Sequence, residues 1–160
     1  MRRLLEWKLT PSQPSIISYE DRLQKLIDYH VKQFPHKAIN SFAQVSLDSY
    51  DINLLREDTD YVWLEYIETT TTKPGRVKPA DTWTTEVSIK YNKKTTGWTF
   101  KLTMNDMTMA DDTGDSFNKL IDKFAKYGFQ IPAKGTKEYD EIMESFIAED
   151  FKIYENLWDN

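Results

Sequence analysis

Apolar residues between positions 18 and 34 recur every three or four residues, which is the period of an α-helix. The recurring apolar side chains are Leu23, Leu26, Ile27, Val31 and Phe34. Ser18 is a suitable N-cap, with Asp21 three residues later as a variant of the capping box. Pro35 ends the pattern, because the residue before a proline avoids the helical region. This segment predicts a helix with one face in the core.

The next segment, residues 36–58, has no such regularity. Its apolar residues come in short clusters that serines and aspartates interrupt. We expect one or two short helices here.

The middle of the chain changes to a period of two, which is typical of half-buried strands. The alternating stretches are DYVWLEYIE (60–68), TWTTEVSIKY (82–91) and GWTFKLTM (97–104). The connection from Asn92 to Gly97 is short enough for a hairpin. The connection over 69–81 is longer than most loops of compact domains, so we expect it to be functional or mobile.

Helical spacing returns in SFNKLIDKFAKYG (116–128), where Ser116 is the expected N-cap and Gly128 the C-cap. A terminal helix capped by Thr136 follows. The order of elements predicts an α+β domain, with a three- to four-stranded antiparallel meander packed against N- and C-terminal helices. One domain spans residues 1–160, and residues 1–17 form a loose or strand-like segment.

Composition agrees with one compact domain, because 160 residues with 39% apolar content can bury a sizeable core. The chain has no cysteine, which excludes disulfides, thiolate zinc sites and cysteine nucleophiles. The N-terminal segment lacks the apolar core of a signal peptide, and no window approaches 18 uncharged apolar residues. We therefore expect a soluble, cytoplasmic protein that does not enter a membrane.

Only two histidines, His30 and His36, offer imidazole chemistry. His30 lies centrally on the apolar face of the first predicted helix. It is a base or ligand, or a core histidine with one hydrogen-bond partner, and the second interpretation is favoured because no motif supplies companions. The acidic segment NDMTMADDTGD (105–115) does not match a calcium loop, because counting back from Gly114 places Met109 at the first ligand position. We expect a helix start there, with Asp115 beside the cap, and no metal site.

No phosphate-binding glycine loop, nucleophile elbow or zincin helix is present in the sequence, which contains only five glycines. Carboxylates are plentiful but specify no reaction. We therefore expect a protein that is not an enzyme and uses no cofactor.

Aromatic residues make up 14% of the chain, and Trp83, Trp98 and Phe100 lie near lysines, as in a stacking platform for single-stranded nucleic acid. The alternation of strand positions argues against that platform, because it places these rings with the apolar residues and the lysines on the opposite face. A basic rim remains as an alternative nucleic-acid site. Its residues are Lys73, Arg76, Lys78, Lys93 and Lys94.

Acidic residues are concentrated at the C-terminal end. Residues 138–160 hold eight acids and one lysine, a balance of −7, so residues 1–137, with 18 acids and 20 bases, carry +2. A helical projection gathers the carboxylates of Glu141, Glu144, Glu155 and Asp159 into a narrow stripe. Like charges at this spacing each cost about 0.2–0.5 kcal/mol, so the stripe does not help the helix to form. The stripe either keeps the protein soluble or binds the basic surface of a partner.

Asp150 falls within the apolar half of the same projection. Either the helix breaks around residues 148–150, which we favour, or this carboxylate is buried and needs a partner.

The leading functional hypothesis from the sequence is a non-enzymatic protein-binding inhibitor of the kind that phages and mobile elements encode. Its acidic C-terminal helix would dock on a basic, nucleic-acid-handling partner, such as a restriction or CRISPR effector or another nuclease. The first alternative is a nucleic-acid-binding module that uses the basic loop 73–78 and the hairpin 90–94. The second is a structural subunit of a virion or assembly.

Overall fold

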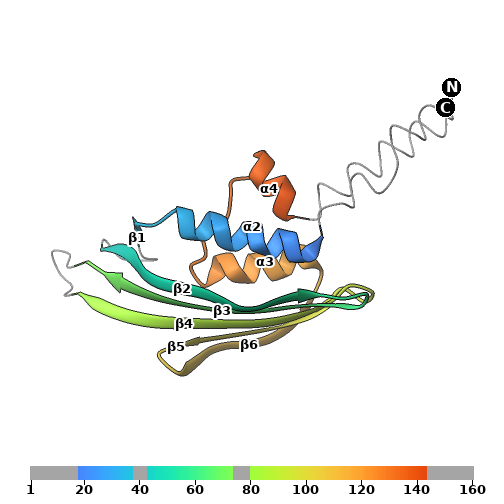
Figure 1. Cartoon of the computed structure of the whole chain (residues 1–160), viewed down its shortest axis with the longest axis horizontal. Coiled ribbons are helices and arrows are strands. Elements are labelled where there is room, and N and C mark those ends of the chain that lie inside the picture. Colours follow the sequence, from blue (N-terminus) through green and yellow to red (C-terminus); the bar gives the residue numbers. More distant parts are fainter. Residues whose placement is uncertain (1–17, 38–42, 74–79, 144–160) are drawn as a thin grey trace.

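The computed structural model describes residues 18–37, 43–73 and 80–143. A long antiparallel sheet forms one layer, and helices lie across one of its faces (Figure 1). The strands are β1 (His36–Lys37), β2 (Gln44–Glu57), β3 (Tyr61–Thr72), β4 (Asp81–Asn92), β5 (Gly97–Met104) and β6 (Met107–Asp115). The helices are α2 (Tyr19–Lys32), α3 (Phe117–Lys126) and α4 (Lys137–Ile142).

The sheet is a meander in which sequence order and spatial order coincide, β1-β2-β3-β4-β5-β6. The fold-class prediction of three to four strands is therefore wrong, because the sheet has six strands. The sheet is also curled, and register shifts interrupt the β2–β3 and β5–β6 pairings. Such irregularities bend a strand and increase its twist.

Two sequence segments account for the missing strands. Residues 36–58, predicted as short helices, form β1 and β2. Two register shifts in β2, between Leu47 and Ser49 and between Ile52 and Leu54, break the alternation that would have revealed a strand. The acidic segment predicted as a helix start is the edge strand β6, which buries only Ala110 and so gives almost no apolar signal.

The predicted helix starts are confirmed at all three caps. The Ser18 hydroxyl accepts a hydrogen bond from the amide of Asp21, Ser116 accepts one from Lys119, and Thr136 accepts one from Tyr139. Each contact satisfies one of the amides that a helix start leaves without a partner. Gly128 follows α3 with a φ of 99°, a conformation that glycine adopts at little cost.

The core lies between the helices and the concave face of the sheet. Its fully buried members include Leu23, Leu26, Leu64, Phe100, Phe117 and Phe124. Burial was expected for Trp83, Trp98, Phe100, Leu23, Leu26 and Phe124, and the structure confirms it for all of these except Trp83. Trp83 is only half-buried, because the sheet extends beyond the helices at its position.

Arg22 joins the first and last described helices. Its side chain is completely buried, and its Nη1 donates to the backbone carbonyl oxygens of Ile142, at 3.1 Å, and Met143, at 2.5 Å. A helix end leaves its last carbonyls without partners inside the helix. The guanidinium of α2 therefore completes the end of α4. Among the described helices, none is long and apolar enough to cross a lipid bilayer.

Candidate ligand-binding cleft

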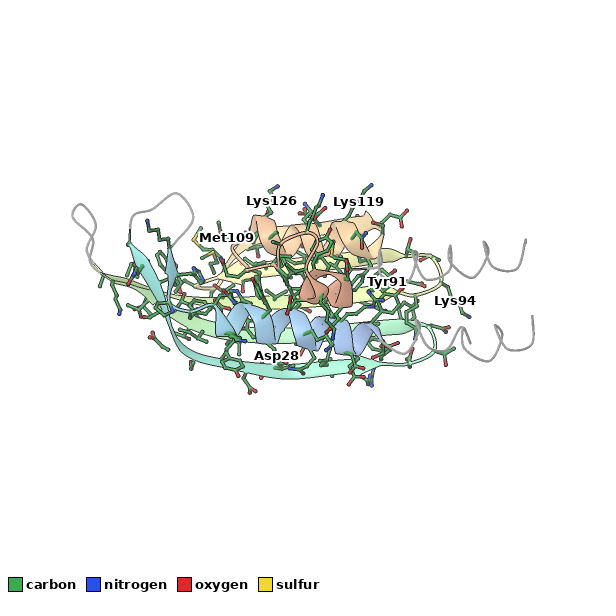
Figure 2. The ribbon with its side chains drawn as sticks, turned by 90° about the horizontal axis from the view of Figure 1, so that it is seen from above. Asp28, Tyr91, Lys94, Met109, Lys119 and Lys126 are labelled. Carbon is green, nitrogen blue, oxygen red and sulfur yellow. The ribbon has the colours of Figure 1, made fainter. Side chains whose placement is uncertain are left out.

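A cleft of about 300 Å³ opens on the concave face at the end of the sheet that carries β1. Seen from above, Lys94 lies at the other end of the sheet, well away from Lys126, which borders the cleft (Figure 2). The cleft residues come from the end of α2, from five strands and from the turn after α3. They are His30, Phe34, His36, Val45, Glu68, Thr70, Trp83, Thr85, Met104, Lys126, Tyr127, Gly128 and Phe129.

A hydrogen-bonded network lies against this cleft. Nε2 of His30 lies 2.8 Å from Oε1 of Glu68, and the Tyr66 hydroxyl donates to the same oxygen at 2.9 Å. The backbone amide of Gln130 donates to Nδ1 of His30 at 3.0 Å. Helix α2, strand β3 and the segment after α3 therefore meet at one imidazole.

The network determines the tautomer of His30. A backbone amide can only donate, so Nδ1 of His30 carries a lone pair. The ring proton then sits on Nε2 and is donated to Glu68. Although the two side chains are as close as an ion pair, the contact is a hydrogen bond from a neutral imidazole. Both ring nitrogens are engaged within the protein.

Glu68 accepts both of these bonds through Oε1, and its other oxygen, Oε2, makes no hydrogen bond with the described residues. The residue is only 7% exposed. Burial, and then the neighbouring Glu68 carboxylate, raise the pKa of the Tyr66 hydroxyl far above its usual value, so the phenol remains a donor. One carboxylate oxygen is thus fixed in place, and the other is left for a partner.

Two threonines extend the polar surface beside Glu68. Thr85 pairs directly with Glu68 across β3 and β4, and Thr70 lies two residues further along β3 on the same face. Both are buried, with 5% exposure for Thr70 and 6% for Thr85. Neither hydroxyl makes a hydrogen bond with the described residues. We call Glu68, Thr70 and Thr85 the polar floor of the cleft.

Aromatic and apolar side chains make up most of the remaining walls. The Phe129 ring stacks on His30 with centroids 4.3 Å apart, and Phe34 meets His30 edge to face at 5.0 Å. Trp83 and Met104 line the cleft from β4 and β5. An apolar hollow with a few converging polar groups is the usual form of a small-molecule site.

His30 is confirmed as a buried histidine, but it has two hydrogen-bond partners rather than the expected one. Glu68, the central residue of the cleft, was missed. A signal for it existed, because Val62, Leu64, Tyr66 and Glu68 alternate along β3 and share its buried face. A carboxylate at a buried strand position requires a partner, and that alone marks it for attention.

The acidic stripe is only partly within the described residues. Glu144, Glu155 and Asp159 lie outside them, as does Asp150. Glu141, in α4, has its Oε2 2.9 Å from the Lys25 ammonium and its Oε1 3.9 Å from that of Lys137. This carboxylate is therefore already paired with cations of the same chain.

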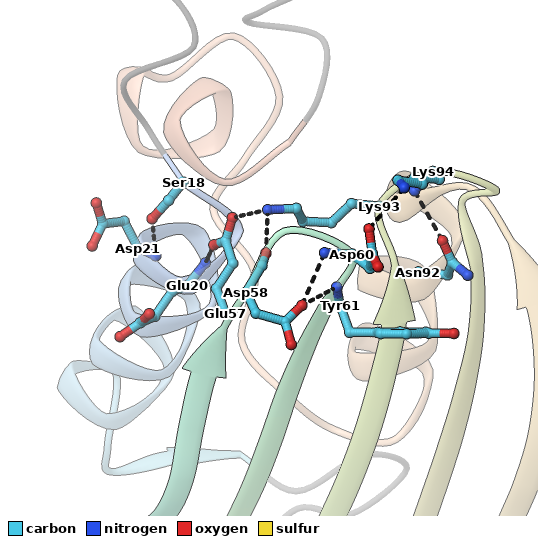
Figure 3. Close-up of polar contacts among 10 residues, drawn as sticks. All are labelled: Ser18, Glu20, Asp21, Glu57, Asp58, Asp60, Tyr61, Asn92, Lys93 and Lys94. Carbon is cyan, nitrogen blue, oxygen red and sulfur yellow. Dashed lines mark hydrogen bonds and ion pairs between the residues drawn. The ribbon is translucent and has the colours of Figure 1, made fainter.

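The predicted basic rim is also divided. Arg76 and Lys78 lie outside the described residues, and Lys73 directly follows β3. Lys93 and Lys94 belong to the tip of the sheet at the end opposite the cleft (Figure 3). The Lys93 ammonium contacts Glu57 at 2.8 Å, and that of Lys94 lies 3.0 Å from Asp60. The structure does not bring the two halves of the predicted rim together within the residues it describes.

The described ranges contain no group of three or more histidine, cysteine, aspartate or glutamate residues that could hold a metal ion. Comparisons of this chain with protein-family models, with curated proteins and with solved structures find no match. The chemistry of the cleft therefore rests on its own geometry.

Proposed function

We propose that this protein is a non-enzymatic binding protein whose cleft takes a small, largely apolar molecule carrying a protonated amine. The observation that supports this most is the second oxygen of Glu68, which lacks a hydrogen bond from the described residues beside an aromatic-lined hollow. A buried carboxylate is costly unless it is paired. A cationic ligand would supply the missing partner.

The aromatic walls favour the same ligand class. Phe34, Trp83, Tyr127 and Phe129 line the cleft, and the faces of aromatic rings attract cations. Lys126 places a positive charge at the mouth, with its ammonium 5.7 Å from the Tyr127 ring centroid. It is exposed, so solvent screens its repulsion, whereas Glu68 is buried and acts with little screening.

Binding is better supported than catalysis. A general base needs a lone pair that can reach a substrate. In His30 the Gln130 amide occupies Nδ1, and the proton on Nε2 is donated to Glu68. The imidazole therefore orients the carboxylate and has no free nitrogen for proton transfer.

A matched pair of probes tests this proposal. 2-Phenylethylamine and 3-phenylpropionate carry the same ring on chains of similar length and have opposite charges. With about nine non-hydrogen atoms, the amine should bind with a dissociation constant on the order of 1 mM or lower. We expect it to bind at least about tenfold more tightly than the acid. Methyl NMR of Met104, which lines the cleft, would report binding directly. Equal binding of both probes, or no response to either, would contradict the proposal.

One sequence observation supports a second candidate, the inhibitor that docks on a basic partner. The charge balance of −7 over residues 138–160 stands against a slightly basic remainder. In this proposal the protein acts in the cytoplasm, and Glu141, Glu144, Glu155 and Asp159 meet the basic surface of a nuclease or another nucleic-acid-handling protein.

The test is a variant in which these four acids become glutamine or asparagine. If the stripe binds a basic partner, association should be slower and less dependent on salt. Faster self-association with unchanged partner binding would indicate a solubility face instead.

The two remaining alternatives have their own tests. A nucleic-acid-binding module would bind single-stranded DNA, with a log–log salt slope steeper than about −2. A virion or assembly subunit would form higher oligomers.

A further inference from the structure

The polar floor of the cleft offers more than one carboxylate oxygen, and this bears on which amines fit. Glu68, Thr70 and Thr85 are each more than nine-tenths buried. Each has a side-chain oxygen that makes no hydrogen bond with the described residues. None of these three oxygens is sealed from solvent, so each can accept a hydrogen bond from a molecule in the cleft.

The strand register holds these oxygens close together. Glu68 and Thr85 face each other across β3 and β4, an arrangement that places their Cβ atoms about 5 Å apart. Thr70 follows Glu68 by two positions, on the same concave face. All three side chains line the cleft. Because they stand on the central strands of a sheet, their positions are rigid.

We infer that the polar floor selects a primary ammonium group over its methylated forms. This inference rests on the proposed function. A primary ammonium has three N–H donors, and the floor offers three acceptors: the free oxygen of Glu68 and the hydroxyls of Thr70 and Thr85. A trimethylammonium group has the same charge and no N–H donor, so it leaves all three oxygens without hydrogen bonds. The carboxylate attracts any cation, and the two hydroxyls distinguish a primary ammonium from a trimethylammonium group.

The threonines next to Thr70 on β3 have paired hydroxyls. The Thr71 hydroxyl donates to Asp48 at 2.6 Å and lies 3.1 Å from that of Thr82. The Thr72 hydroxyl bonds the backbone of Asp81. These two threonines of β3 find partners nearby, whereas Thr70 on the same strand faces a hollow.

The experiment compares 2-phenylethylamine with its N,N,N-trimethyl derivative by calorimetry on the full chain. The native protein should bind the primary amine at least about tenfold more tightly. Thr85→Val and Thr70→Val keep the side-chain volume and remove one hydroxyl each. Each should weaken binding of the primary amine by about three- to tenfold, the effect of one hydrogen bond. Binding of the trimethyl derivative should stay within about twofold.

Thr99→Val is the matched control, because Thr99 is exposed on β5 outside the cleft. It should change neither affinity. Equal affinity of the native protein for both amines, or unchanged amine binding in both cleft valine variants, would overturn the inference. The proposed function would still stand if the primary amine bound more tightly than 3-phenylpropionate. It would fail if neither amine bound.

Discussion

Polar side chains at the two ends of the sheet differ in their hydrogen bonding. At the tip, where the β2–β3 and β4–β5 turns meet, charged groups pair with one another or with the backbone (Figure 3). Glu57 accepts from the amide of Glu20 at 2.7 Å and from Lys93 at 2.8 Å. In the cleft, Glu68, Thr70 and Thr85 each have an oxygen that makes no hydrogen bond with the described residues.

The difference separates polar groups that build the fold from those available to a ligand. The Asp58 carboxylate accepts from the amides of Asp60 and Tyr61 and so fixes the β2–β3 turn. Lys93 closes the same corner by donating to the carbonyl of Asp58 at 2.7 Å. Lys93 is engaged by Glu57 and by the Asp58 carbonyl, so the tip offers less to nucleic acid than its lysines suggested. The cleft retains capacity in a buried position, where it is worth most.

The largest contrast should appear between two tryptophans. Trp98, at the tip end of β5, is 5% exposed, and its indole donates to the carbonyl of Ser116 at 2.9 Å. Trp98→Ala should lower the free energy of unfolding by about 3–5 kcal/mol. Trp83→Ala in the half-buried cleft wall should cost less than about 1.5 kcal/mol, because less apolar surface is lost.

Urea unfolding of both variants would measure this contrast. The Trp83→Ala variant should also bind 2-phenylethylamine more weakly than the native protein. Trp98→Phe, a conservative change that keeps the protein folded, should leave this binding unchanged. Equal destabilisation by the two alanine substitutions would mean that Trp83 is a structural core residue.

A smaller effect is expected for the charged pair at the tip. Lys93 and Glu57 are only 22% and 15% exposed in their side chains, and Lys93 also holds the Asp58 carbonyl. Lys93→Met should cost about 1 kcal/mol, at the upper end for a pair near the surface. Lys94→Met is the control, because the pair with Asp60 is 70% and 47% exposed. Its effect on unfolding should not be measurable, and a larger loss than for Lys93 would contradict this account of the tip.

The smallest expected effect is on the stability of the protein at low pH. Hydrogen bonds from the amides of Tyr61 and Asp60 lower the pKa of Asp58. The Thr96 hydroxyl and the Ser116 amide do the same for Asp115. A carboxyl with a lowered pKa in the folded state adds stability above its unfolded pKa of about 3.9 and loses it as pH falls through the folded value.

Unfolding below about pH 4 should therefore depend on these two carboxyls. In Asp58→Asn and Asp115→Asn, acid unfolding followed by circular dichroism should become less steep, with a lower stability at pH 7. Asp106→Asn is the control, because the Asp106 side chain makes no hydrogen bond with the described residues. If the acid-unfolding curve of a variant has the same slope as that of the native protein, these carboxyls do not contribute to acid unfolding.

The sequence predicted those elements whose period is clear. The helices capped by Ser18 and Ser116 and the central strands follow directly from apolar spacing. Strands β2 and β6 were missed for two different reasons. Register shifts disturb the period of β2, and the edge strand β6 buries only one side chain. Secondary structure there is decided by pairing with a neighbour, which a local pattern does not contain.

The candidate site shows a similar division. His30 was singled out, and its burial was anticipated, but its partners lie 38 and 100 residues away, at Glu68 and Gln130. Only the curled sheet and the turn after α3 bring them together. The acidic stripe assumed a continuous terminal helix, but α4 ends at Ile142, before Glu144, and the one described member, Glu141, already pairs with Lys25. Whether the stripe binds a partner stays a prediction.

The central claim is that Glu68 is a ligand-binding carboxylate held ready by His30 and Tyr66. Glu68→Gln tests it most directly, because the amide oxygen can still accept from both neighbours while the negative charge is lost. An amide NMR spectrum would show that the fold and the Gln130 amide are unchanged. Calorimetric titration with 2-phenylethylamine should then give an affinity at least about tenfold lower than for the native protein. Undiminished amine binding by the folded variant would contradict the account.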